Sequence, residues 1–200
     1  YDFEGNMTDM YAQLNLNYDK VNAFISGKYS KVDYQRNGLF QNDRFPDTSL
    51  GESEPIQFSN WSGKSGLTYN ITGRHWATAN TAFINKAPLL QNVFINPREN
   101  NTVVPNLQSE KITSIDLNYF LRMPKLTGRL TGFYTRFQDG TDVNFFFVDS
   151  GIGSDFVQEV LTDLDKLHLG TELGLEYQLS SAVKLSLVTS VSKYLYASDP

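Results

Sequence analysis

The sequence of 200 residues contains no cysteine, so it can form neither a disulfide framework nor a zinc site with thiolate ligands. It also lacks any run of about 18 consecutive apolar residues, the length that a transmembrane helix needs. Basic residues are in the minority: 17 Lys and Arg stand against 22 Asp and Glu, which gives a net charge of −5. This balance argues against nucleic-acid binding, which needs a concentrated basic face.

Catalytic motifs are missing as well. The chain has no G-x-S-x-G, no glycine-rich phosphate loop and no H-E-x-x-H, the patterns that mark common hydrolases, nucleotide-binding proteins and zinc proteases. Its two histidines, His75 and His168, stand on separate predicted strands without metal-ligand spacing. We therefore expect no enzyme activity, no metal site and no cofactor.

Alternation of apolar and polar residues dominates the chain and predicts β-strands with two different faces. The clearest example is Leu167, Leu169, Leu173 and Leu175, which share one face while polar or small residues fill the other. Segments with this period are residues 10–18, 21–30, 60–71, 75–84, 115–122, 126–135, 166–179 and 183–195. They predict about eight strands of roughly 9 to 15 residues, and a tilted strand that crosses a membrane needs about 9 to 11.

The connections alternate between short and long. Tight turns are predicted at 19–20, 72–74, 123–125 and 180–181, and long loops at about 35–58, 85–109 and 139–165. In an up-and-down meander all the long loops gather at one end, as in outer-membrane barrels. The predicted fold is therefore all-β, an antiparallel up-and-down meander of about eight long strands that forms part of a transmembrane β-barrel. The second loop starts with the apolar residues 85–97, which we expect to fold inward or to pack on neighbouring loops.

Alternation alone does not say which face lies outside. Two alternatives therefore stay open: a complete small barrel of eight strands that acts as an anchor or adhesin, and a soluble β-sheet module that binds a ligand. Strand length and the one-sided long loops favour a membrane barrel. A polar face rich in Asn, Gln, Ser and Thr also favours it, because such a face suits a crowded lumen.

Three ordered stretches carry a family resemblance. Residues 104–111 (VPNLQSEK), which run into residues 115–119 (IDLNY), resemble N-P-x-L-x-x-E-x followed by E-x-G-Y. Residues 131–140 (TGFYTRFQDG) resemble a strand end with F-Y-x-x-x-x-D, and residues 164–177 (LDKLHLGTELGLEY) resemble a strand with G-x-E. In this order the stretches are similar to those of TonB-dependent receptors, in which an extracellular loop returns to a barrel strand.

This resemblance implies that residues 1–200 are part of a barrel of about 22 strands, without the plug domain and the remaining strands. It implies a receptor in the outer membrane of a Gram-negative bacterium, in contact with lipid. Its ligand would be a bulky nutrient such as a siderophore, haem, cobalamin or an oligosaccharide. A TonB complex would drive uptake through the plug, and no covalent chemistry is implied.

Candidate ligand contacts lie in the predicted loop 139–165, which holds seven Asp and Glu and no Lys or Arg. We interpret these acids as a solvated outer surface, with a Ca²⁺ site as the alternative. Phe145, Phe146 and Phe147, with Asp149 and Asp155, would contact a ligand, the plug or a partner such as a surface lipoprotein. The favoured interpretation of the aromatic run is structural: residues 143–148 and 156–161 form a hairpin that extends the barrel wall.

Overall fold

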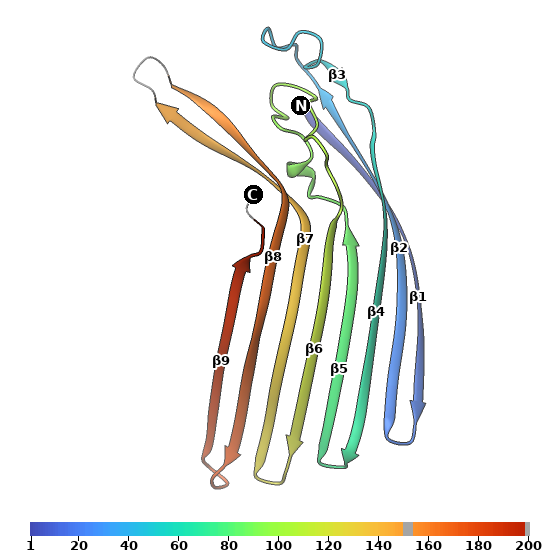
Figure 1. Ribbon diagram of the computed structural model, residues 1–200, viewed down its shortest axis with the longest axis vertical. Coiled ribbons are helices and arrows are strands. Elements are labelled where there is room, and N and C mark those ends of the chain that lie inside the picture. Colours follow the sequence, from blue (N-terminus) through green and yellow to red (C-terminus); the bar gives the residue numbers. More distant parts are fainter. Residues whose placement is uncertain (150–153, 199–200) are drawn as a thin grey trace.

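The computed structural model describes residues 1–149 and 154–198, which form one open, curved antiparallel sheet (Figure 1). Its long strands are β1 (Asp2–Tyr18), β2 (Val21–Gly38), β4 (Ile56–Thr72), β5 (His75–Lys86), β6 (Glu110–Arg122), β7 (Leu126–Asp149), β8 (Ser154–Gln178) and β9 (Lys184–Tyr196). The connections contain the short strand β3 (Gly51–Glu52) and a 3-10 helix, η1 (Leu90–Asn92). No helix within the described ranges is long and apolar enough to cross a membrane.

Each long strand pairs with the next one along the chain, in the order β1-β2-β4-β5-β6-β7-β8-β9, and β3 pairs with β2. The tight turns β1–β2, β4–β5, β6–β7 and β8–β9 lie at one end of the sheet, and the long connections rise from the other (Figure 1). This confirms the predicted meander of eight long strands and the gathering of its long connections. The end with the long connections is called the loop end below.

Several strands are longer than predicted. β2 has 18 residues, β7 has 24 and β8 has 25, and the additional residues lie at the loop end. The long connection predicted over residues 139–165 consists mostly of paired strand in the part that the structure describes. Phe145 pairs with Gln158 and Phe147 with Phe156, and pairing continues to Asp149 and Ser154. The favoured hairpin is confirmed.

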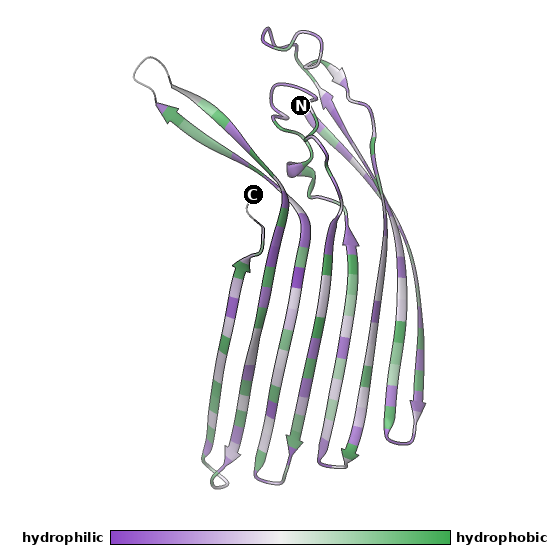
Figure 2. Cartoon of the chain, viewed as in Figure 1, coloured by the Kyte–Doolittle hydropathy of each residue, from purple (hydrophilic) through white to green (hydrophobic). Residues whose placement is uncertain are grey.

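The two faces of the sheet differ in solvent exposure. The apolar face is the exposed one and polar side chains on the other face are buried, the reverse of a soluble protein. Leu117 is 59% exposed, whereas the side chain of its neighbour Asn118 points to the other face and is 7% exposed. The apolar face also exposes Leu14, Leu16, Ile25, Leu67, Leu130, Leu187 and Val191, and apolar and polar bands alternate along the strands (Figure 2). An apolar surface of this extent marks contact with a membrane or partner, and it matches the lipid face of a barrel strand.

Side chains on the polar face bond to one another across three strands. Asn80 on β5 and Asn118 on β6 both donate to Asp116 Oδ2, at 2.8 and 2.7 Å. From β7, Thr131 and Arg129 both donate to Asn118 Oδ1, at 2.8 and 3.0 Å. Because polar groups with partners are stable where water is restricted, this face can line a crowded interior.

The apolar face ends towards the loops at a row formed by Met10, Tyr29 and Trp61. The rings of Tyr29 and Trp61 lie 4.7 Å apart, and aromatic residues favour membrane–water interfaces. The next two residues of β2 on this face are Lys31 and Asp33, which hydrocarbon would not accept. About nine residues of β2, numbers 21–29, thus span the membrane, the length that a tilted strand needs, and the strand continues beyond it.

Gly170 and Gly174 lie on the polar face of β8 and offer a matched test of packing. A Cβ at Gly170 would lie 2.7 Å from the carbonyl oxygen of Val191 and 2.8 Å from Cζ of Phe133, whereas nothing lies within 4 Å at Gly174. We expect Gly170→Ala to lower the free energy of unfolding by about 1–3 kcal/mol because the site is overpacked. Gly174→Ala should change it by less than about 0.5 kcal/mol. Urea unfolding of the full-length protein in lipid vesicles measures both, and equal midpoints would contradict the packing.

Candidate functional site

Buried Arg36, near the outer end of β2, ties the first two long connections to the sheet. Its side chain is 2% exposed. Nε donates to the carbonyl of Pro97 at 2.6 Å, and Nη1 donates to the carbonyl of Ser49 at 3.1 Å and to Oδ1 of Asn101. Burial lowers the pKa of this guanidinium from its ordinary value, but an arginine stays charged in proteins. One cation thus satisfies acceptors from two separate loops.

The second long connection packs its apolar residues inward. Val93 and Phe94 are fully buried, and the Phe94 ring stacks on Phe3 of β1 with centroids 5.7 Å apart. Asn92 Nδ2 donates to the carbonyl of Thr141 on β7 at 2.8 Å. The prediction that this apolar loop folds inward or packs on its neighbours is confirmed, and the loop spans the sheet from β1 to β7.

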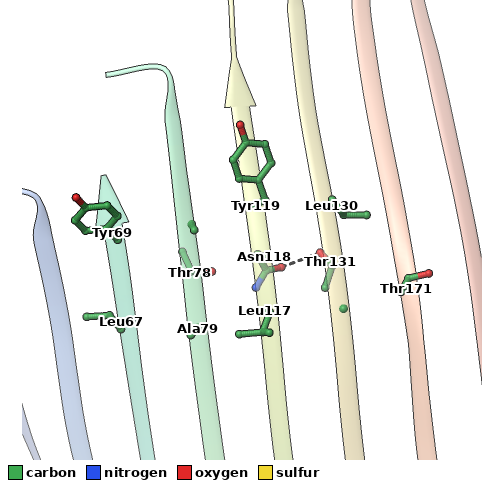
Figure 3. A pocket seen from close by; sticks show the side chains of 12 residues that line it. Leu67, Tyr69, Thr78, Ala79, Leu117, Asn118, Tyr119, Leu130, Thr131 and Thr171 are labelled. Carbon is green, nitrogen blue, oxygen red and sulfur yellow. Dashed lines mark hydrogen bonds between the residues drawn. The ribbon is translucent and has the colours of Figure 1, made fainter. Parts of the chain in front are cut away.

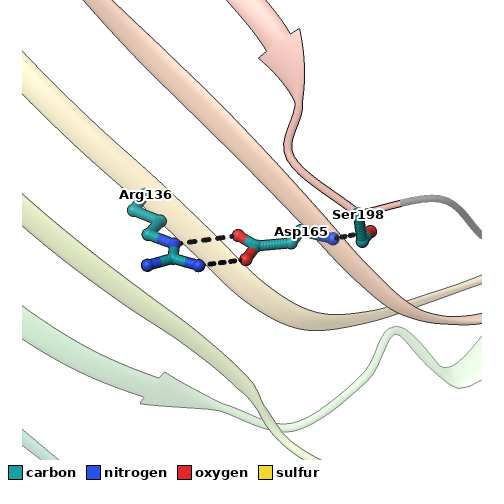
Figure 4. Close-up of polar contacts among 3 residues, drawn as sticks. All are labelled: Arg136, Asp165 and Ser198. Carbon is teal, nitrogen blue, oxygen red and sulfur yellow. Dashed lines mark hydrogen bonds and ion pairs between the residues drawn. The ribbon is translucent and has the colours of Figure 1, made fainter.

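The base of the β7–β8 hairpin is fixed by a forked ion pair (Figure 4). Arg136 donates through Nε to Asp165 Oδ1 at 3.1 Å and through Nη2 to Oδ2. The backbone N–H of Asp165 donates to Ser198 Oγ at 3.0 Å. Beyond this pair the β7–β8 register shifts twice, between Phe137 and Asp142. Because a bidentate pair fixes orientation as well as distance, it sets the point from which the hairpin extends.

These elements enclose a cavity of 560 Å³ at the loop end, which we call the outer cavity. The first long connection contributes Arg44 and Phe45, the second contributes Arg98, and the hairpin contributes Phe145 and Phe156. This volume lies within the range of small-molecule sites. Aromatic and cationic groups together favour a ligand with ring faces or negative charge.

The described residues that line the outer cavity include two cations, Arg44 and Arg98. Nη1 of Arg44 lies 3.7 Å from Oε1 of Glu99, and its guanidinium lies 5.9 Å from the centre of the Phe45 ring. Arg98 is exposed and lines the same cavity. Among the described residues that line the cavity, two arginines, Arg44 and Arg98, thus stand beside one carboxylate, that of Glu99.

The five predicted contact residues do not share one location in the structure. Phe145 lines the outer cavity. Phe147 shares its face and meets the Phe156 ring at 5.4 Å, whereas Phe146 points to the opposite face, paired with Val157. Asp149 ends β7 opposite Ser154, and Asp155 pairs with Val148. The side chain of Asp155 lies outside what the structure describes.

Sequence reasoning missed Arg44, Phe45 and Arg98. Each stands in a polar loop without periodicity, so no local signal marks it, and only the tertiary arrangement brings it to Phe145. In the part of the chain that the structure describes, no group of three or more His, Asp or Glu is placed to hold a metal ion.

Comparison with known proteins decides the family. The family model described as TonB dependent receptor-like, beta-barrel matches residues 1–200. The chain belongs to the TonB-dependent receptor family. Receptors of this family are β-barrels of the Gram-negative outer membrane that act as receptors and transporters rather than enzymes. The membrane-facing side inferred from exposure is therefore the lipid face of a TonB-dependent receptor, and the polar side is its lumen face.

Solved structures agree on the fold. The copper transporter OprC is similar with a TM-score of 0.72 and 18% identity, over 96% of this chain and 29% of OprC. The FrpB iron transporter from Neisseria meningitidis gives a TM-score of 0.70 and 13% identity, over 98% of this chain and 27% of FrpB. The siderophore receptor PirA from Pseudomonas aeruginosa gives 0.61 and 13%, over 97% and 44%. The chain thus spans less than half of each of these receptors. A search of curated protein sequences gives no significant match.

Family membership also decides between the earlier alternatives. A complete small barrel would require β1 to pair with the last strand, but β1 and β9 are the two unpaired edges of the sheet that the structure describes. A soluble module would require the exposed leucines to be packed inside, and they lie on the outer face of a receptor barrel.

Proposed function

We propose that this chain is the part of a TonB-dependent receptor that captures a metal chelate at the cell surface and forms one side of its import path. The outer cavity carries the proposal, because it combines Phe45, Phe145 and Phe156 with Arg44 and Arg98 at the loop end. Aromatic faces pack against the organic shell of a bulky chelate. Guanidinium groups bind its carboxylate or catecholate oxygens in a forked geometry.

The similar structures favour metal over the other nutrients that the sequence left open. They are described as a copper transporter, an iron transporter and a siderophore receptor. Cobalamin, haem and oligosaccharides are therefore the less favoured ligands. The two arginines of the cavity also favour a metal chelate, because an oligosaccharide without charge gains little from their positive charge.

The lumen face supports a role in transport as well as in capture. A cavity of 610 Å³ opens on this face beneath the second long connection, lined among others by Lys28, Asn60 and Lys64. We infer that a plug domain, moved by the TonB complex, fills the barrel against this polar surface. The ligand would then pass from the outer cavity along the lumen face.

Phe145→Ala should weaken ligand binding while Phe146→Ala should not. Phe145 lines the outer cavity and Phe146 is its neighbour on the opposite face of the same strand, so the two variants remove equal apolar surface. We expect Phe145→Ala to raise the dissociation constant about tenfold, as for a central aromatic contact. Titration calorimetry on the purified full-length receptor, with ferric catecholate, hydroxamate and carboxylate chelates and with Cu²⁺, measures the difference.

The same panel tests the proposed ligand class. Tight binding of one metal species, weakened by Phe145→Ala and by Arg98→Gln, supports the proposal. Binding of haem, cobalamin or an oligosaccharide but of no chelate or Cu²⁺ would contradict the ligand class. Equal losses in the Phe145 and Phe146 variants would contradict the assignment of the site.

A further inference from the structure

A groove of 470 Å³ crosses the lipid face near the tight turns (Figure 3). Its floor is formed where small residues lie between large ones. Ala79 on β5 pairs with Leu67 on β4 and with Leu117 on β6, and Leu117 in turn pairs with Gly132 on β7. The groove is continuous with the face that contacts hydrocarbon, and its lining is almost entirely apolar.

Polar groups gather where the groove approaches the tight turns. Tyr69 and Tyr119 stand on either side of Ala77 in the next row of the sheet. The hydroxyl of Tyr119 lies 2.6 Å from Nδ1 of His75, the first residue of β5. Tyrosine and histidine on a lipid-facing surface suit the level of the headgroups, where one end of the side chain is apolar and the other is wet.

Positive charge completes this end of the groove. The turns on either side of it contain the exposed cations Arg74 and Lys125, and the turn residues 72–74 and 123–125 include no acid. Cations near the membrane surface attract anionic headgroups by about 1 kcal/mol each. The groove therefore has an apolar body and a cationic, hydrogen-bonding end, which matches the two parts of a phospholipid.

We propose that this groove holds a glycerophospholipid of the leaflet next to the tight turns. One acyl chain lies over Ala77, Ala79 and Gly132, and the phosphate lies at the level of Arg74 and Lys125. Since a lipid tail loses no water on moving from bilayer to groove, packing contributes little selectivity. The headgroup end supplies the preference, and phosphatidylglycerol, with its net negative charge, is preferred to phosphatidylethanolamine. This site is independent of the nutrient and of the outer cavity.

Photolabelling of the full-length protein in outer-membrane vesicles tests the groove. The probe is a phosphatidylglycerol with a diazirine on its acyl chain, and peptide mapping locates the label. We expect labelling concentrated on β4, β5, β6 and β7, and about a threefold loss in Ala79→Leu, which fills the groove with a side chain that hydrocarbon accepts. Ala12→Leu is the control, because Ala12 lies on the lipid face of β1 and does not line the groove.

The headgroup end has its own test. Exchange of Arg74 and Lys125 for Gln should lower the labelling by phosphatidylglycerol relative to phosphatidylethanolamine by about fivefold for each cation removed. Lys20→Gln, in the β1–β2 turn, should leave the ratio unchanged. Label spread evenly over all lipid-facing strands, or equal labelling of Ala79→Leu and Ala12→Leu, would overturn the proposal. An unchanged lipid preference in the double Gln variant would also overturn it.

Discussion

Leu173→Arg is expected to impair assembly of the barrel into lipid strongly. Leu173 lies on the lipid face of β8, between Leu130 on β7 and Thr189 on β9. A cation near the membrane midplane costs a barrel about 2–4 kcal/mol. Arginine can lower that cost only by extending its guanidinium towards a membrane–water interface, and the distance to either interface is greatest from the middle of the strand.

The neighbouring position provides the control. Glu172 lies on the opposite face of the same strand and is exposed, so Glu172→Arg puts the same side chain into the lumen. We expect it to change folding by less than about 1 kcal/mol. Urea titration of the full-length receptor refolded into phospholipid vesicles, followed by heat-dependent mobility on gels, compares the two. Equal destabilisation would contradict the assignment of faces on which the membrane argument depends.

The membrane part of the fold could be read from the sequence because lipid and lumen impose opposite requirements on alternate residues. Leu167, Leu169, Leu173 and Leu175 were assigned to one face from spacing alone, and the β7–β8 register places them together. Short turns such as 19–20 leave little freedom in pairing, so they fix which residues stand opposite each other. Tyr18, for example, pairs with Val21 across the first turn.

The parts of the strands outside the membrane could not be read in this way. In the first half of β1 the pattern is inverted, because Glu4 and Thr8 share the face on which Met10 and Leu14 lie further along, while Met7 is on the opposite face. This part of the strand lies outside the membrane, where the outer face of the receptor contacts water and apolar residues are not required. The backbone pairing continues without the alternation that signals it, and the predicted strand therefore began too late.

The outer cavity was only partly predictable for a different reason. Phe145 drew attention through its two phenylalanine neighbours, but hairpin geometry sends Phe145 and Phe146 to opposite faces, and only one reaches the cavity. Arg44 and Arg98 lie in connections without alternation of apolar and polar residues, so the sequence pattern does not predict where their side chains lie. Several of the bonds that hold these loops in place go to backbone carbonyls, those of Ser49, Pro97 and Thr141. Every residue has a backbone carbonyl, so no residue pattern in the sequence identifies such acceptors.

Arg36→Ala is expected to release both long connections without unfolding the barrel. The guanidinium satisfies Pro97, Ser49 and Asn101 from inside the loop assembly, and alanine leaves one buried and two half-buried acceptors without this donor. Hydrogen bonds to a charged group contribute about 1.5–3 kcal/mol each, so a loss of about 3 kcal/mol in local stability is a conservative expectation. Amide hydrogen exchange should quicken about a hundredfold at Asn101 and Val104, whose N–H groups bond to Thr48 and Val93.

Arg36→Lys and Arg74→Ala show whether geometry or charge alone is responsible. Lysine keeps the charge but lacks the planar fork that reaches separate acceptors, so it should restore only part of the protection. Arg74 is exposed in a tight turn at the other end of the sheet, and its loss should leave the loops unchanged.

Because Arg44 and Arg98 are carried by the released loops, the affinity for the chelate should fall in Arg36→Ala. The unfolding free energy of the barrel, measured in urea, should stay within about 1 kcal/mol of its original value. Unaltered exchange at Asn101 would show that the loops hold together without this cation, through Phe94 and the other apolar contacts beneath them.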